Sequence, residues 1–510
     1  MKPSVPTPER DLSRRGFCKT AAAAALLTGA PFIRAAKPRA TTRPPNLLFV
    51  MADEWRRQAM GFMGEDAVRT PNFDRFASDA LVFNGSCATR PICSPSRSSL
   101  MSALYPQHHG IYNNGLEQPL NPALPTLGTW LKSAGYRTSF VGKLHTGGHP
   151  ETHGVIPQSF RRQWDNWMLA VGHQPFRQPY YMGWNTEPIY HDGWAPDFEA
   201  EQTIDFMRGN RDQPFAAVLS WGPPHVGWGP GFEDRWQPGH RKKGKIPFGL
   251  GSGAPLQYEA LYTPYNRIPR RPNVSPVVAP DGTPDPSDFM LPGYFGACTA
   301  IDTAFGHLIE SLRQLDLYEN TLIVFTSDHG EMLGSHGHVQ KGIYFEEAIG
   351  VPLLMRLGRD LPARRVNNLI STIDLAPTML GLLGAPLNAK VDGSDFSGFC
   401  RGRSETTTDA LNLSFDAGGQ HVSREQPQGS RRAWRAIRTE RYTYALLDGG
   451  FSRAVPNKSR RVLFDLKEDP YEMHPITGGK QQPIMDDLHG RLVAHLSAVG
   501  DNFMTTKYVW

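Results

Sequence analysis

Cys93 is a candidate reactive residue, because it begins the segment Cys93-Ser94-Pro95-Ser96-Arg97. Of the five cysteines, Cys18 lies in the N-terminal segment considered below. The other four show neither the CxxC spacing of a metal or redox site nor a disulfide framework. These four are Cys87, Cys93, Cys298 and Cys400. We therefore expect one of them to take part in a reaction.

Polar residues with side chains that could catalyse a reaction follow four apolar segments of the chain. They are Asp53 and Glu54 after residues 46–52, Lys143 and His145 after residues 138–141, His225 after residues 215–220, and Asp328 and His329 after residues 321–327. If the four segments are strands of one sheet, these residues lie at the carboxyl ends of strands, where such sheets bind ligands. Each residue alone has an ordinary explanation, such as a helix cap or a surface charge. Their joint occurrence favours a site.

The sequence that follows Cys93 resembles the signature of the type I sulfatases, which belong to the alkaline-phosphatase superfamily. It runs C-S-P-S-R-S-S-L-x-S-A-x-Y-P-x-x-H-G as far as Gly110. The first five residues alone are only suggestive, whereas the longer match is specific. The resemblance extends from Asp53 to residues 463–470. It implies that Cys93 is oxidised to formylglycine, whose hydrated aldehyde supplies the oxygen that attacks sulfur.

The resemblance also implies a metal ion, usually Ca²⁺, held by Asp53, Asp328, His329 and the modified Cys93. A divalent cation held by carboxylates can acidify the attacking hydroxyl and bind the sulfate oxygens. Glu54 stands where many members of the family have a second Asp, and we include it among the expected metal ligands.

The other expected site residues are cationic and acid–base groups, again implied by the resemblance. Arg97 and Lys143 would stabilise the formylglycine hydrate and the neighbouring metal ligands. His145 would remove a proton, so that the aldehyde forms again and sulfate leaves. His225 and Lys341 would bind the substrate sulfate, and one of them would protonate the leaving oxygen.

The segments that end in these residues favour an α/β fold. Residues 46–52 and 321–327 are continuous apolar runs, as in central strands covered on both faces. Helix-like stretches cover residues 126–134 and 296–317. Strands that alternate with helices predict a large, mixed but mostly parallel sheet flanked by helices.

Two other parts of the chain depart from this alternation. Residues 226–290 are rich in Pro, Gly, aromatic and basic residues, and they predict an irregular substrate-loop insertion in a catalytic domain of residues 44–400. Residues 401–510 predict a smaller C-terminal α+β subdomain. Its expected antiparallel strands and terminal helix are residues 434–447, 461–466 and 486–496.

Residues 1–36 resemble a twin-arginine export signal. The segment Ser13-Arg14-Arg15-Gly16-Phe17-Cys18-Lys19 precedes an alanine-rich apolar run, which is too short and weak to span a bilayer stably. We therefore expect the twin-arginine translocase to deliver the protein to the periplasm or the medium. Because that route carries folded cargo, the chain would meet its formylglycine-generating maturase before export.

Charge and export together restrict the partners. Of the formal net charge of +5, residues 1–36 contribute +4, from six Lys or Arg and two Asp or Glu, which leaves +1 for the rest. Nothing in this balance indicates nucleic-acid binding. Export favours sulfated polysaccharide fragments as substrates, and the aromatic and basic insertion suits sugar rings and anionic groups. Choline sulfate and small aryl sulfates remain open.

Two alternative functions also remain open. Phosphonate and phosphate ester hydrolases of the superfamily share the modified cysteine, but they tend to replace the Lys-x-His element with neutral hydroxyl residues. Lys143-Leu144-His145 therefore favours a sulfatase. A non-catalytic glycan-binding relative should have lost at least one site residue, and the visible departure is Glu54.

Overall fold

The computed structural model of this chain describes residues 43–114, 119–146, 163–170, 176–182, 188–225, 254–264, 267–274, 286–405, 407–416, 433–448 and 460–503. Residues 44–510 form one compact unit. The expected export signal and residues 226–253 of the expected insertion lie outside the described residues. In the part of the chain that is described, we find no helix long and apolar enough to cross a membrane.

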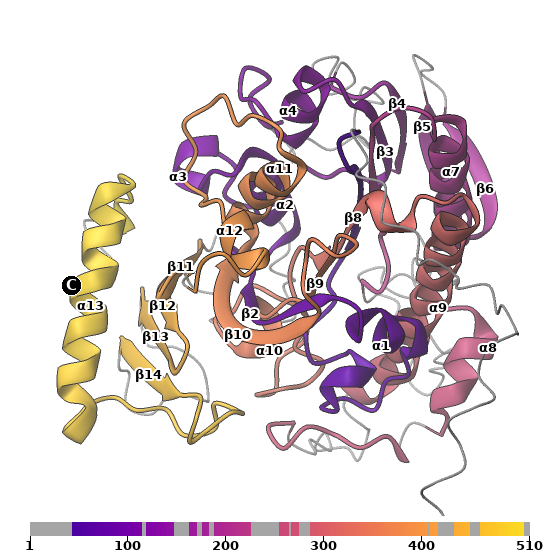
Figure 1. Cartoon of the computed structure of the whole chain (residues 1–510). Helices are drawn as coiled ribbons and strands as arrows, with labels where there is room; N and C mark the ends of the chain where they lie inside the picture. The colour runs from indigo at the N-terminus through magenta and orange to yellow at the C-terminus, as the bar shows by residue number, and fades with distance from the viewer. Residues whose placement is uncertain are drawn as a thin grey trace, which may run out of the picture. The chain divides into compact units, whose positions relative to one another are not determined.

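Ten of the described strands form one mostly parallel sheet (Figure 1). Its order is β10-β2-β9-β8-β1-β7-β3-β4-β5-β6. The strands are β1 (Asn46–Ala52), β2 (Leu81–Cys87), β3 (Arg137–Lys143), β4 (Asn166–Ala170), β5 (Phe176–Met182), β6 (Ile189–Trp194), β7 (Phe215–Ser220), β8 (Thr321–Ser327), β9 (Leu353–Arg356) and β10 (Arg364–Ser371). β1 is parallel to β7 and β8, whereas β9, β5 and β6 run antiparallel to their neighbours. The predicted α/β fold is confirmed.

Both faces of β1 are buried, which is why this strand is a continuous apolar run. Leu48 and Val50 pack into one apolar cluster, and Leu47 and Phe49 pack into another. Because side chains alternate along a strand, the two clusters lie on opposite faces of the sheet. Full burial of each such side chain contributes about 2 kcal/mol.

Helices cover both of these faces. α1 (Pro71–Ala77), α7 (Ala195–Gly209) and α9 (Pro286–Gln314) pack into the cluster of Leu48. α2 (Cys93–Ser102), α4 (Leu127–Ser133), α11 (Leu375–Leu383) and α12 (Ser397–Cys400) pack into the cluster of Leu47. Further short helices are α3 (Pro106–His109), α8 (Leu256–Glu259) and α10 (Glu346–Ile349).

Four described strands near the C-terminus form a second, antiparallel sheet in the order β11-β12-β13-β14. They are β11 (Ala410–Phe415), β12 (Trp434–Thr439), β13 (Tyr442–Leu447) and β14 (Arg461–Asp465). One face packs on α13 (Gln482–Ala498), which lies alongside the sheet in Figure 1. The other face packs on Ile343, Phe345 and Ile349. The C-terminal α+β subdomain therefore supports the segment that follows β8.

Helix α9 extends ten residues further toward the N-terminus than predicted. It begins at Pro286 and includes Pro292, which cannot donate a backbone hydrogen bond. Leu291, Tyr294 and Phe295 on either side of this proline are buried in the core, and this packing stabilises the early turns. Residues 286–290, the last part of the expected irregular insertion, are therefore helical. Helix α8 also lies within this expected insertion.

Candidate active site

The predicted site residues meet at one edge of the large sheet. β8, β1, β7 and β3 are neighbours and run in the same direction, so their carboxyl ends lie side by side. These ends carry Asp328 and His329 after β8, Asp53 and Glu54 after β1, His225 beyond β7, and Lys143 and His145 at the end of β3. His145 is partly buried, and the others are buried.

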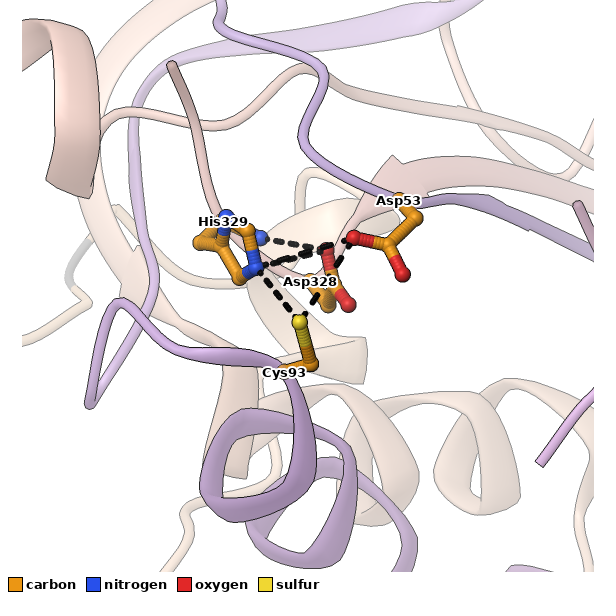
Figure 2. Close-up of side chains that lie close together, drawn as sticks. All are labelled: Asp53, Cys93, Asp328 and His329. Atoms are coloured by element: carbon orange, nitrogen blue, oxygen red, sulfur yellow. Dashed lines mark hydrogen bonds and ion pairs between the residues drawn. The ribbon is translucent and has the colours of Figure 1, made fainter. Parts of the chain in front are cut away.

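Asp53, Cys93, Asp328 and His329 form the centre of the site (Figure 2). Each offers one ligand atom, and the four atoms lie within 4.8 Å of one another. Cys93 Sγ is 3.3 Å from His329 Nε2 and 3.8 Å from Asp53 Oδ1. His329 Nε2 is 3.6 Å from Asp328 Oδ1. Two carboxylates and an imidazole that converge in a buried place fit a divalent cation.

His329 directs a ring nitrogen at this cluster. Its Nδ1 atom lies 3.0 Å from the carbonyl oxygen of Gly330, which can only accept a hydrogen bond. Nδ1 therefore carries a proton, and Nε2 faces Cys93 and the carboxylates. Burial disfavours charge on the ring, but Asp328 and Cys93 raise the pKa of His329 above its usual value. A bound cation would take the place of the second proton.

Arg97 and Lys143 balance the charge of the two aspartates. Arg97 donates from Nε to Asp328 Oδ2 at 2.7 Å and from Nη2 to Asp53 Oδ2 at 3.2 Å. Lys143 forms an ion pair with Asp53. Burial alone would raise the pKa of Asp53, but Lys143 and Arg97 hold this pKa well below its usual range. Asp53 is therefore ionised and suited to bind a cation.

Cys93 differs in electrostatic environment from the other cysteines that the structure describes. Burial raises the pKa of Cys87 and of Cys400 to about 12, and it raises that of Cys298 well above the usual value. Burial acts in the same direction on Cys93, yet Lys143 and other cations lower its pKa well below the usual range. Position 93 is therefore built to carry negative charge.

Glu54 lies beside the central cluster and contacts the two residues expected to bind sulfate. Its Oε1 accepts a hydrogen bond from Lys341 Nζ at 2.9 Å, and its Oε2 lies 3.2 Å from His225 Nε2. Lys341 Nζ also donates to His225 Nε2 at 2.7 Å. Asp53, Glu54 and His225 together offer ligand atoms within 4.8 Å of one another. The expected metal ligation by Glu54 stays a prediction.

His145 and His225 are both neutral near pH 7. Burial lowers the pKa of each to about 4, with further lowering by Lys143 at His145 and by Lys341 at His225. Both imidazoles interact with the Cys93 side chain, and they come from different strands. His145 has a left-handed backbone, with a φ of 45°. Such strained residues occur often at functional sites.

Sequence reasoning missed two serines that hold the site together. Ser96 Oγ donates to the carbonyl oxygen of Asp328 at 2.5 Å. Ser220 Oγ accepts from Arg97 Nη1 at 2.8 Å and donates to the carbonyl oxygen of Lys143 at 2.7 Å. Ser96 lies within the Cys93 segment, and Ser220 is the last residue of a predicted strand. In the sequence, these two positions were the signal that could have identified the serines as site residues.

The fold and the site define a class of enzyme. A mostly parallel sheet gathers a candidate cation site, an unusual cysteine and buried cations that contact this site at its carboxyl edge. The cations are Arg97, Lys143 and Lys341. Such an arrangement belongs to metal-dependent hydrolases that attack anionic esters.

Comparison with known proteins identifies the family. The family model described as Sulfatase matches residues 45–385, and the model described as N-sulphoglucosamine sulphohydrolase, C-terminal, matches residues 334–498. The chain belongs to the sulfatase family. It is a type I sulfatase of the alkaline-phosphatase superfamily, and therefore a sulfuric ester hydrolase.

Individual relatives span nearly the whole chain. An ulvan-active sulfatase of Formosa agariphila is 31% identical over 91% of this chain and 83% of its own length. An endo-4-O-sulfatase of Bacteroides thetaiotaomicron is 28% identical over 91% of this chain and 94% of its own. The crystal structure of yidJ, a candidate sulfatase from Bacteroides fragilis, shares the fold. Its TM-score is 0.77 at 24% identity, and the match covers 93% of this chain and 100% of yidJ.

Proposed function

We propose that this sulfatase hydrolyses sulfate esters of carbohydrates, with a formylglycine formed from Cys93 and a bound Ca²⁺ ion. The observation that carries the proposal is the buried cluster of Asp53, Cys93, Asp328 and His329. The names of the ulvan-active and endo-4-O-sulfatase relatives support a carbohydrate substrate.

The donor atoms of the cluster favour calcium with an oxidised position 93. The carboxylates are hard oxygen donors, which Ca²⁺ prefers, and an oxygen at position 93 suits this ion better than a sulfur. When present, the ion and the formylglycine would supply an activated oxygen nucleophile and positive charge for the sulfate. Asp53, Asp328 and His329 would hold the ion, and Glu54 is a further candidate ligand.

The other residues of the site bind charge or move protons. Arg97 and Lys143 form ion pairs that hold the ligand carboxylates in place, and they keep Asp53 ionised. His145 is neutral and accepts a proton from position 93 as sulfate leaves. Lys341 and His225 bind the sulfate. Burial lowers the pKa of Lys341, but Glu54 raises it above its usual value, so Lys341 holds a proton for the leaving oxygen.

The alternatives fit these residues less well. A phosphonate or phosphate ester hydrolase would favour neutral hydroxyl residues at the Lys-x-His element, where this chain has Lys143 and His145. A non-catalytic glycan-binding protein would not need a charge-balanced, buried cluster around Cys93. We also propose that twin-arginine export places the enzyme in the periplasm or the medium.

Mass spectrometry and sulfate release together test this function. After co-expression with a formylglycine-generating maturase, the peptide that contains Cys93 should be about 18 Da lighter than the thiol form. Purified protein should release sulfate from sulfated oligosaccharides, and Cys93→Ala should fold but release none. Full activity of Cys93→Ala, or an unmodified thiol in fully active enzyme, would refute the mechanism.

A further inference from the structure

The segments next to Cys93, here called the rim of the site, carry an exposed tyrosine, Tyr112, in contact with a buried arginine, Arg90. Arg90 lies three residues before Cys93, and its side chain is fully buried. Its guanidinium carbon is 5.6 Å from the centre of the Tyr112 ring, and Tyr112 is 39% exposed. A hydrogen bond joins the loop of Tyr112 to helix α2: Asn114 Oδ1 accepts it from the backbone N–H of Ser94 at 2.9 Å. Tyr112 is therefore held close to the N-terminus of the helix that begins at Cys93.

The C-terminal sheet reaches the same rim through the end of β11. The ring of Phe415 lies 5.7 Å from the Arg90 guanidinium carbon. It also packs on Gly342, where an added Cβ would lie 2.9 Å from the ring. Trp434 Nε1 donates to the carbonyl oxygen of Gly342 at 3.1 Å, and the preceding residue is Lys341. The end of β11 therefore lies between the loop before the nucleophile and the lysine expected to bind sulfate.

Asp416 places a fixed carboxylate at this rim. Arg90 Nη1 donates to its Oδ2 at 2.8 Å, and Arg435 Nη2 donates to its Oδ1 at 2.9 Å. Asp501 accepts from Arg435 Nε at 2.7 Å, so two arginines face two aspartates without excess charge. The side chain of Asp416 remains 30% exposed. A balanced cluster of this kind offers little attraction to a second sulfate.

We propose that Tyr112 and Asp416 bind the sugar ring next to the one that carries the sulfate, and that this neighbouring ring carries free hydroxyls. The proposal rests on the proposed function. The exposed Tyr112 ring can stack on the apolar face of a sugar, and the Asp416 carboxylate accepts hydrogen bonds from sugar hydroxyls. Both residues contact the same Arg90 guanidinium, so they lie within reach of one sugar ring.

The test compares two substrates in four variants. The first substrate is the sulfated oligosaccharide that the wild type cleaves best, beginning with ulvan oligosaccharides. The second is para-nitrophenyl sulfate, which has no neighbouring sugar. The variants are Tyr112→Ala, Tyr112→Phe, Asp416→Asn and, as a control, Tyr190→Ala. Tyr190 is 60% exposed and lies on β6, at the edge of the large sheet.

We expect Tyr112→Ala to raise the KM for the oligosaccharide at least about tenfold relative to the KM for the aryl sulfate. Asp416→Asn should shift the ratio in the same direction, because it weakens a hydroxyl acceptor. Tyr112→Phe keeps the stacking ring and should stay near the wild type. Tyr190→Ala should leave the ratio unchanged.

Three outcomes would overturn the proposal. They are an unchanged ratio in Tyr112→Ala, an equal shift in Tyr190→Ala, and a fall of kcat on both substrates without a change in the ratio. The aryl sulfate separates this failure from that of the proposed function. A wild type that cleaves no sulfate ester refutes the function itself, whereas a wild type active on both substrates with an unmoved ratio refutes the sugar site alone.

Discussion

Asp53 and Glu54 are adjacent in sequence, yet their carboxylates have different partners. Asp53 pairs with Arg97 and Lys143 within the central cluster, whereas Glu54 pairs with Lys341 on the side expected to bind sulfate. The two acidic residues should therefore differ in what their replacement disturbs. Replacement of Asp53 should weaken metal binding, and replacement of Glu54 should weaken substrate binding.

Chelation should abolish activity, and Ca²⁺ should restore it. Asp53→Ala removes a ligand and should weaken Ca²⁺ binding by at least about 100-fold, whereas Glu54→Gln keeps an oxygen donor and should weaken it by less than about tenfold. Glu54→Gln should instead raise KM, because Lys341 loses its ionic partner. Calorimetric titration with Ca²⁺ measures the first effect and steady-state kinetics the second. The reverse order of metal affinities would show that Glu54 is the principal ligand.

His145 and His225 should act at different steps, because they approach position 93 from β3 and β7. His145→Ala should permit the first release of alcohol and then stall, giving a burst followed by slow turnover in rapid-mixing experiments. His225→Ala should slow that first release, most severely for substrates with poor leaving groups, because His225 Nε2 accepts the hydrogen bond that positions the proton donor Lys341. Identical defects in both variants, across good and poor leaving groups, would contradict this division of roles.

At the scale of elements, helix α10 connects the two sheets through a buried carboxylate. Glu346 at its start accepts from Arg57 Nη2 at 2.5 Å and from Arg438 Nε at 2.6 Å. Arg57 follows β1, and Arg438 lies in β12. Burial alone would raise the pKa of Glu346, but Arg438 and Arg57 lower it from 4.5 to about 2. The ionised carboxylate therefore stabilises the fold.

Glu346→Gln should destabilise the protein by about 3–5 kcal/mol near pH 7, since it leaves two buried arginines without their anion. The folded pKa lies below the unfolded one, so this stabilisation is complete above the unfolded value and is lost as the pH falls toward about 2. The difference in unfolding free energy between the variant and the wild type should therefore shrink on acidification. Urea unfolding at about pH 7, 5 and 3 measures it.

Glu319→Gln provides the matched control for this prediction. Glu319 pairs with Arg356 at 2.7 Å, but its side chain is 70% exposed. Arg356 is buried but keeps its ion pair with Asp79 at 2.6 Å, so loss of the exposed Glu319 carboxylate should change the free energy of unfolding by less than about 1 kcal/mol. A large loss from Glu346→Gln that did not vary with pH would argue against an ionised carboxylate at this position.

Elements buried on both faces were predictable from sequence. β7 and β8 coincide with predicted strands because their apolar runs are unbroken. β10 was not predicted, because its first half alternates between partly exposed and exposed residues. The start of α9 was missed because Pro292 ordinarily ends a helix, and tertiary packing outweighs that local preference.

At the scale of the whole molecule, contacts between distant segments could not be predicted. The strand-end positions of Asp53 and Asp328 could be found from local patterns and from the family resemblance. The pairing of Glu54 with Lys341 joins residues 287 positions apart, and no local pattern encodes it. The contact of Arg90 with Asp416 spans 326 positions and depends on how the C-terminal sheet packs.

Export should depend on the paired arginines near the N-terminus. Full-length protein expressed with a twin-arginine translocase should appear in the periplasm with residues 1–36 or nearby residues removed. Replacing Arg14 and Arg15 together with Lys should leave active enzyme in the cytoplasm, because folding does not require transport. Cell fractionation with activity assays and N-terminal mass spectrometry measures both. Equal export of the double variant would argue against this route.

The end of β11 and the carboxyl edge of the large sheet belong to different segments of the chain, although they meet beside Lys341. Substitutions near Phe415 and Asp416 can therefore accumulate over generations while the atoms that break the ester bond stay the same. If the proposed sugar site is right, such substitutions would change which polysaccharide fragments the enzyme accepts and would leave the reaction itself unchanged.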